Sequence, residues 1–409
     1  MRTDPAADKR DEVAIASRVP EPDDKIWFHK TASAVIDAGR CVGCGGCIAA
    51  CPSRSISVGS DGKPTLTKMC TGCSACWDYC PVAGLRVERL QKLCADADPG
   101  DDEGMGDGAG PVLAAYSARA ATPHRGQDGG FVTALLQELL AAGEIDAAIV
   151  SKREDAFRAT TIIATTPEEI EHAAGSVYHQ SEPLAVLNRP MPAGIRRIAY
   201  VGTPCQISVL RALQRYPWPL RDDAAPKVVL AIGLFCTRSF DPFELMKLLV
   251  ERGEDVGRIE RLDIREGKLS VRDADGTRRE LGPIKRFRDA SLKGCDECAD
   301  FTGNLADLSV GNVGSDPGAS TVLVRTEAGM KAWAIVEEHL GSRAIADLGS
   351  VWKMQDRNRD AAVAALSRDY DPYGPLWIRY GSHLEDYLDT DRAPQPAPPF
   401  RSHHFDVSC

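Results

Sequence analysis

CVGCGGCIAACP, from Cys41 to Pro52, and CTGCSACWDYCP, from Cys70 to Pro81, share the spacing C-x2-C-x2-C-x3-C-P. Thiolate sulfur is the soft ligand that iron–sulfur clusters prefer. Three cysteines two residues apart, then a fourth followed by proline, form the pattern of bacterial two-cluster ferredoxins. The repeat therefore predicts two 4Fe-4S clusters in a bacterial-ferredoxin-like module.

The fourth cysteine of each stretch is expected to ligate the cluster of the other stretch. The two predicted ligand sets are Cys41, Cys44, Cys47 and Cys80, and Cys70, Cys73, Cys76 and Cys51. Structural zinc sites are the alternative. Their ligands usually come as pairs separated by about a dozen residues, so two complete four-cysteine strings fit zinc poorly.

The composition limits the other possibilities. A chain of 409 residues suggests two or three domains. Its net charge of -10 argues against nucleic acid as a partner, because phosphate binding needs a basic face. No apolar run approaches the roughly 20 residues of a transmembrane helix. The polar N-terminus predicts no secretory signal, and cysteines gathered in metal-binding strings indicate a reducing, cytoplasmic compartment.

The chain divides by composition into five parts, and we expect an α+β fold. An Asp/Gly-rich stretch reads as a linker, so we expect the segments on either side to fold separately. Beyond it, strand and helix patterns alternate as in an α/β domain, and residues 258–282 read as a smaller antiparallel part. The expected parts are a polar leader (1–35), the two-cluster module (36–92), the linker (93–111), the α/β domain (112–385) and a proline-rich tail (386–409).

Four further cysteines lie in the α/β part: Cys205, Cys236, Cys295 and Cys298. A C-x2-C pair such as the last two can bind metal or do redox chemistry. Free cysteines are more often small buried hydrophobic residues, so spacing alone leaves both interpretations open. Cys94 and Cys409 stand alone, and we expect Cys94 to be an ordinary helix residue.

The motifs around these cysteines resemble those of a known family. GTPCQI, IGLFCT and the stretch from Cys295 to Ser315 are similar to beta subunits of coenzyme F420 hydrogenases and dehydrogenases. The resemblance covers roughly residues 36–385 and includes members with an N-terminal two-cluster module. It implies that Cys205, Cys236, Cys295 and Cys298 bind a third 4Fe-4S cluster beside FAD, which makes 112–385 a flavin-binding domain.

A glycine pair opens the predicted helix after Arg125. N–H groups at a helix start favour an anion, although a helix can also simply begin after a turn there. The resemblance places FAD near this stretch and near matching segments further on. No G-x-G-x-x-G follows a strand, so a dinucleotide Rossmann site is not supported. The flavin or pocket candidates are Gly129, Gly130, Thr133, Ser176, Tyr178, Asn312, Gly314, Ser320 and Thr321.

Two groups of residues near these segments have a functional and an ordinary interpretation. His124, His172 and His179 are either proton donors at the flavin or satisfied histidines. The basic stretch from Lys285 to Asp289, with Lys293, is either a solvated face or a site for the phosphate and glutamate tail of coenzyme F420. The sequence assigns no catalytic residue, and no nucleophile elbow supports hydrolysis.

The resemblance implies an oxidoreductase that passes electrons between a hydride carrier, coenzyme F420, and a ferredoxin or larger complex, through FAD and 4Fe-4S clusters. Two alternatives stay open. One is a ferredoxin-dependent reductase that reduces an organic substrate at the flavin. The other is a non-catalytic relay subunit of a hydrogenase or formate dehydrogenase.

Overall fold

A computed structural model describes residues 27–85, 90, 94, 110–122, 124, 126–215 and 224–366. Its centre is a mixed sheet with the strand order β13-β3-β12-β11-β7-β6-β4-β5. Neighbours are parallel from β11 through β7 and β6 to β4, and antiparallel elsewhere. The strands are β3 (Ala114–Ala120), β4 (Ala147–Arg153), β5 (Ala159–Ala164), β6 (Ile198–Gly202), β7 (Val228–Leu234), β11 (Leu308–Gly311), β12 (Ser320–Val324) and β13 (Leu340–Ala344).

Helices cover both faces of this sheet because its strands alternate apolar side chains between them. In β4, Ala147 and Ile149 join the core on one face, and Ala148 and Val150 join the core on the other. The first core includes α8, and the second includes α6, α7 and α10. The helices are α6 (Phe131–Ala141), α7 (Pro167–His172), α8 (Pro204–Arg215), α10 (Glu327–Val336) and α11 (Gly349–Leu366).

One edge of the sheet collects the predicted functional segments. Strands β3, β4, β6, β7 and β11 run in the same direction, so their carboxyl ends meet at this edge. Cys205 follows β6, Cys236 follows β7, and Asn312 follows β11. Ligands of open α/β sheets bind at such an edge.

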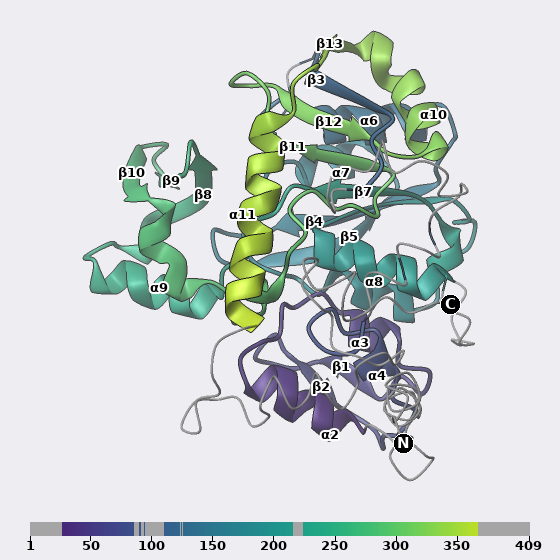
Figure 1. The fold of residues 1–409 in the computed structure, drawn as a ribbon, viewed down its shortest axis with the longest axis vertical. Helices are drawn as coiled ribbons and strands as arrows, with labels where there is room; N and C mark the ends of the chain where they lie inside the picture. The colour runs from purple at the N-terminus through teal and green to yellow at the C-terminus, as the bar shows by residue number, and fades with distance from the viewer. Residues whose placement is uncertain are drawn as a thin grey trace, which may run out of the picture.

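The predicted antiparallel part is a separate three-stranded sheet, which Figure 1 shows beside α9. It has its own core, in which Leu269 and Val271 are fully buried against Phe287 and Leu249. The meander expected over 258–282 is therefore confirmed. Its elements are α9 (Pro242–Glu251), β8 (Ile259–Arg265), β9 (Lys268–Asp273), β10 (Arg278–Pro283) and the 3-10 helix η6 (Ile284–Ala290).

The N-terminal module lies below the large sheet, next to α8, in Figure 1. The stretch between the cysteine strings forms an antiparallel hairpin of β1 and β2. Residues 28–35, which we assigned to a polar leader, instead form helix, with Phe28 and Val35 buried in the module. Its elements are α2 (Phe28–Thr31), a π-helix (Ala32–Asp37), α3 (Gly46–Ala49), β1 (Ile56–Val58), β2 (Pro64–Leu66) and α4 (Ala75–Asp78).

The module and the large sheet share one apolar core, which argues against the expectation that they fold separately. Val42 and Leu85 belong to the same buried cluster as Ile207 and Leu210 of α8. A Cβ on Gly46 would lie 2.7 Å from Cγ1 of Val209. A polar linker between two parts of a chain does not prevent them from packing together, because packing depends on the side chains that each part presents to the other.

Several elements lacked a clear sequence signal. Helix α11 and the strands β5 and β13 were not expected, and β13 is almost fully exposed, so it lacks an apolar alternation. Cys94 is helical as expected, whereas the linker over 95–109, the tail and Cys409 lie outside the described residues. Within the part that the structure describes, no helix is long and apolar enough to cross a membrane.

Candidate redox site

The first predicted ligand set gathers around the start of α3. Burial raises the pKa of Cys47, and the nearby thiols of Cys41, Cys44 and Cys80 raise it further. The four side chains therefore lie close enough to interact electrostatically. Backbone N–H groups donate to the sulfurs of Cys41 (3.5 Å, from Gly43) and Cys44 (3.4 Å, from Gly46). Gly45 has a φ of 78°, a left-handed turn that glycine adopts without strain.

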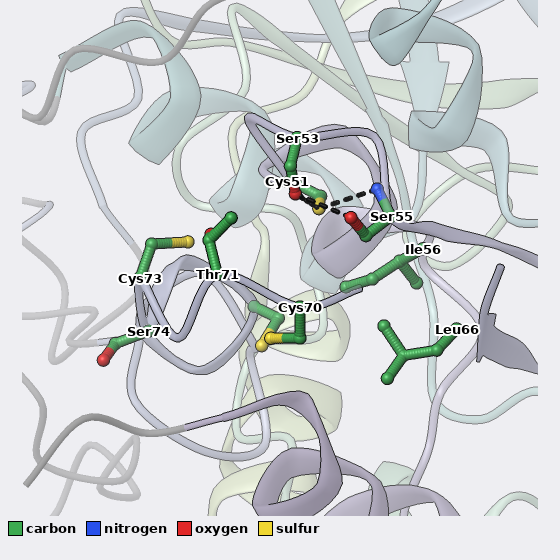
Figure 2. Close-up of a pocket in the computed structure, with 10 residues that line it drawn as sticks. Cys51, Ser53, Ser55, Ile56, Leu66, Cys70, Thr71, Cys73 and Ser74 are labelled. Atoms are coloured by element: carbon green, nitrogen blue, oxygen red, sulfur yellow. Dashed lines mark hydrogen bonds between the residues drawn. The ribbon is translucent and has the colours of Figure 1, made fainter. Parts of the chain in front are cut away.

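The second predicted set lines a pocket beside the hairpin. Figure 2 shows Cys51, Cys70 and Cys73 around it, with Ile56 and Leu66 of the hairpin at one side. Burial raises the pKa of Cys76 to about 12, and the other three thiols of the set contribute to the rise.

Backbone donors also reach the sulfurs of this second set. The N–H of Ser55 donates to Cys51 Sγ at 3.3 Å, and that of Gly72 donates to Cys70 Sγ at 3.4 Å. N–H···S bonds of this kind are among the means by which a protein tunes an iron–sulfur cluster.

These two sets fit 4Fe-4S clusters on chemical grounds. Burial raises the pKa of Cys41 to about 11 and that of Cys80 to about 12. Thiols so placed do not ionise together unless a cation compensates them, and coordinated iron supplies that charge. The N–H groups around the sulfurs then stabilise the thiolates.

The third group of cysteines also converges. Cys205 lies in the first turn of α8, Cys236 follows β7, and Cys295 and Cys298 flank the 3-10 helix η7 (Lys293–Glu297). All four line one cavity, together with Val42, Pro81, Val82, Gln180, Pro204, Ser208, Thr237, Ser239, Gly294 and Asp300. Burial and then the thiols of Cys295 and Cys205 raise the pKa of Cys236. The structure thus brings these four thiols to one buried cavity.

The three thiol sets have a spatial order. After burial, Cys205 is the strongest influence that raises the pKa of Cys44, ahead of Cys80 from its own set. Cys76 of the second set in turn affects the pKa of Cys47 and Cys80. Cys41, Cys44 and Cys80 also share one core cluster with Cys205 and Cys295, and Cys47 shares another with Cys51, Cys70 and Cys76, so the Cys41 set lies between the other two sets.

A buried ion pair joins the module to the loop of Cys295 and Cys298. Arg40 donates from Nε to Glu297 Oε1 at 2.7 Å, and its side chain also bonds the carbonyls of Ala34 and Val82. Both charged side chains are almost fully buried. A Cβ on Gly294 would lie 2.0 Å from Arg40 O, so only glycine fits at this contact.

Helix α11 holds the other side of this loop. Gln355, which is 1% exposed, accepts from the Phe301 N–H at 2.9 Å and donates to Ala299 O at 2.8 Å. Asn358 donates to Cys236 O at 3.2 Å. The helix thus fastens the backbone of both segments that carry Cys236 and Cys298.

The segment from Gly175 to Leu184 runs past these sites in turn. Tyr178 donates to Gln127 at 2.8 Å and accepts from the Ile264 N–H at 2.9 Å. Gln180 lines the Cys205 cavity. The N–H of Leu184 donates to Cys44 O at 3.2 Å. A continuous stretch therefore connects the predicted flavin segment to two thiol sets.

The glycine pair at the start of α6 is required by the protein's own packing. A Cβ on Gly129 would lie 2.4 Å from Ala118 O and 2.6 Å from Ser320 N. Gly130 has a φ of 68°, and its Cβ would meet the ring of His124 at 2.2 Å. These glycines therefore do not by themselves indicate a phosphate, although α6 still begins without a side-chain cap.

The remaining flavin candidates lie around the start of β12 and around the first turn of α6 and Tyr178. Ser320 and Thr321 are buried at the start of β12, where Thr321 bonds Ser315 at 2.7 Å and lies under Gly314. Asn312 is exposed. Thr133 is buried in the first turn of α6, and Ser176 contacts the Tyr178 hydroxyl.

The basic stretch and the histidines are dispersed. Arg288 pairs with Asp296 at 3.4 Å, Lys285 is exposed, and Lys293 lies against Gly39 of the module. His172 is exposed. Burial lowers the pKa of His179, and the backbone of this residue forms an isolated bridge with that of Phe240.

Sequence reasoning missed the polar residues that hold the site together: Gln127, Gln180, Glu297, Gln355 and Asn358. Amides and isolated charges carry no spacing signal. Arg40, directly before Cys41, and Glu297, between Cys295 and Cys298, stood at cysteine motifs.

Comparison with known proteins agrees with this arrangement. Residues 34–87 match the family model of a 4Fe-4S dicluster domain. Residues 112–188 and 195–345 match the models of the N-terminal and C-terminal parts of the coenzyme F420 hydrogenase/dehydrogenase beta subunit.

Individual relatives give the same result. The beta subunit of coenzyme F420 hydrogenase from Methanosarcina barkeri is 33% identical over 58% of this chain and 80% of its own length. The coenzyme F420-dependent sulfite reductase of Methanocaldococcus jannaschii is 33% identical over 74% of this chain, but the match spans only 47% of that protein. A chain of the F420-reducing [NiFe] hydrogenase complex from Methanosarcina barkeri superposes with a TM-score of 0.59 at 29% identity, over 64% of this chain and 94% of that one.

This chain therefore belongs to the family of coenzyme F420 hydrogenase/dehydrogenase beta subunits and carries a ferredoxin-like 4Fe-4S dicluster domain at its N-terminal side.

Proposed function

We propose that this chain is an iron–sulfur flavoprotein oxidoreductase that passes electrons between coenzyme F420 and a ferredoxin or larger partner complex. The observation that carries the proposal is the spatial order of the residues. The 175–184 segment runs from Tyr178 to the Cys205 cavity, and Cys205 packs in the same core cluster as Cys44.

The thiols in this proposal hold three clusters. Residues within the dicluster match, 34–87, supply two of them, and Cys205, Cys236, Cys295 and Cys298 supply the third. The N–H donors to Cys41, Cys44, Cys51 and Cys70, together with burial, set how easily each site accepts an electron.

The proposal places flavin at the carboxyl edge of the large sheet. FAD, when bound there, would exchange two electrons with a hydride carrier and single electrons with the clusters. Uncapped N–H groups at the start of α6 favour a phosphate. The residues proposed to line this site are Gly129, Gly130, Thr133, Ser176, Tyr178, Asn312, Gly314, Ser320 and Thr321.

The relatives support the choice of carrier and partner. Several are named for coenzyme F420, and one solved relative is part of a hydrogenase complex. A component of the F(420)H(2) dehydrogenase of Methanosarcina mazei is 30% identical over 55% of this chain and 63% of its own length. We therefore infer a redox protein or a larger oxidoreductase complex as the physiological partner.

Anaerobic mixing of the reconstituted full-length protein with reduced coenzyme F420, and separately with NADH, tests the proposal. Three clusters require about twelve irons per chain. We expect Cys295→Ser to lower this to about eight, with flavin absorbance still bleached by reduced F420 and cluster absorbance bleached far more slowly. The matched control is Cys94→Ser, a helical cysteine outside the three sets.

The outcomes separate the alternatives. About eight irons in the unaltered protein would make the Cys205 group structural. Protein that keeps its clusters but binds no flavin would be a non-catalytic relay. Flavin that is reduced by ferredoxin and never by F420 or NADH would indicate the ferredoxin-dependent reductase.

A further inference from the structure

The second thiol set reaches the protein surface more than the other two sets do. Among the described cysteines, Cys73 alone is exposed, and the neighbouring Thr71 is exposed as well. Figure 2 shows both side chains at the pocket that Cys51 and Cys70 also line. Electron transfer between two proteins becomes faster as their redox centres come closer. A cluster in this pocket is therefore the one that a partner protein can approach most closely.

Large apolar side chains surround this point and are exposed. Met69 is 89% exposed, and Leu66, which lines the same pocket as Cys73, is 39% exposed. Trp27 is 40% exposed and covers Gly72, where a Cβ would lie 2.9 Å from the indole ring. Exposed apolar residues are normal when scattered, but a patch of them marks a contact with another molecule. We call this patch of Trp27, Leu66 and Met69 around Cys73 the Cys73 face.

The exposed charges beside the Cys73 face are positive. Lys68 directly precedes Met69, and Arg54 lies between two serines that line the pocket. Lys30 is exposed one helical turn after Trp27. Neither lysine forms an ion pair with another described residue. Cations at the rim of an apolar patch favour a partner whose own rim is negative.

The exposed acidic residues of the module lie elsewhere. Within residues 27–85 they are Asp37 and Asp61. Asp61 lies in the hairpin turn, where its carboxylate accepts from the Lys63 N–H at 3.1 Å, whereas the Cys73 face adjoins the other end of the hairpin. Asp37 ends the π-helix two residues before Gly39, which packs against Lys293 outside the module. The face is therefore positive, although the whole chain has a net charge of -10.

We propose that the Cys73 face docks an acidic iron–sulfur electron carrier, a ferredoxin with negative side chains around its own cluster. Complexes of this kind bury little area, so complementary charge steers their encounter. One electron leaves the reduced cluster of the carrier and enters the oxidised cluster held by the second thiol set, and no bond or proton is exchanged. The inference rests on the proposed function, and it adds the face that receives the partner and the charge of that partner.

The test mixes oxidised, reconstituted full-length protein anaerobically with a reduced acidic two-cluster ferredoxin. Electron paramagnetic resonance of rapidly frozen samples follows the transfer. The variant is Lys68→Glu, and the matched control is Lys331→Glu, because Lys331 is exposed on α10, which packs on the opposite face of the large sheet from the module (Figure 1). At low ionic strength we expect the second-order rate constant to fall about 10-fold with Lys68→Glu and less than about 2-fold with the control.

Salt and an uncharged variant separate the roles of charge and apolar contact. Near 1 M salt the Debye length is about 3 Å, so the effect of Lys68→Glu should vanish. Met69→Ser should lower the rate constant about 3- to 10-fold at low and high salt alike, because it removes apolar contact area. No effect of Met69→Ser at either salt concentration overturns the docking role of the patch.

The other outcomes are equally decisive. An unchanged or faster rate with Lys68→Glu overturns the inference, and is the result expected if the chain's own acidic stretch 96–107 occupied the face. An equal loss with Lys331→Glu overturns it as well. A dimer in sedimentation velocity that Met69→Ser dissociates would assign the face to a second copy instead of the carrier. If Lys68→Glu loses iron, Lys30→Glu takes its place and must show the same loss of rate.

Failure of the proposed function is distinguishable from failure of this face, because the ferredoxin supplies the electrons and neither coenzyme F420 nor flavin is needed. If the unaltered protein does not oxidise reduced F420 but loses its ferredoxin rate with Lys68→Glu, the docking face holds without the proposed function. If it oxidises reduced F420 and its exchange with ferredoxin is insensitive to Lys68→Glu, the face is wrong and the proposed function holds.

Discussion

Single buried polar side chains hold the thiol sets in place. The Arg40–Glu297 pair has side-chain exposures of 5% and 6%, and Arg40 also bonds two carbonyls of the module. Removing one partner of such a pair leaves an uncompensated buried charge, which costs more than the pair contributes by itself. The pair therefore acts mainly to fix how the module and the Cys295 loop meet.

Glu297→Gln should lower the free energy of unfolding by about 3 kcal/mol. The measurement is the midpoint of urea denaturation, followed by far-ultraviolet circular dichroism. Glu280→Gln is the matched control, because Glu280 pairs with Lys268 at an exposed site, where such a pair contributes below about 1 kcal/mol. Equal shifts for both variants would contradict the special role of the buried pair.

At the scale of an element, α11 lies beyond the part of the chain that matches the family models. The matched family residues end at 345, whereas α11 begins at Gly349 and bonds the loops of Cys236 and Cys298. Its packing also covers Leu323 of β12 through Val351. The helix thus holds the backbone of two segments that carry cysteines of the Cys205 cavity.

Gln355→Ala should loosen this cavity, because it leaves the Phe301 N–H and the Ala299 carbonyl without their partner. Each unsatisfied buried group costs about 1–3 kcal/mol. We expect about four irons per chain to be lost faster to a chelator, while the other irons stay. Lys353→Ala, an exposed change on the same helix, should leave the rate unchanged, and a rate that rises equally in both variants would argue against the clamp.

At the scale of the molecule, the shared core makes the module and the large sheet one folding unit. The apolar face of α8 packs against the module on one side and the sheet on the other. Each uncovered Leu, Ile or Val side chain forfeits about 1.5–3 kcal/mol of burial. In a chain of two domains joined by a free linker, removal of one domain would uncover no apolar side chains of the other.

Deletion of residues 1–92 should therefore give a poorly soluble protein that binds a hydrophobic dye and unfolds without a cooperative transition. Size-exclusion chromatography and thermal denaturation measure this against the full-length chain. A monomeric truncated protein with a sharp transition would mean that the larger part folds alone, as the linker composition suggested.

The sequence by itself determined the features that chain connectivity controls. Eight cysteines within 40 residues (Cys41 to Cys80) can meet only in a few ways, so their spacing predicted a dicluster module that the family match confirms. Local patterns likewise predicted α6, the helix that the glycine pair opens, and the meander of β8 to β10. Only the tertiary structure decided which distant residues meet, because strand order and direction set those contacts. It brought Cys205 beside Cys44 and Arg153 beside Arg261, pairs that no local spacing relates.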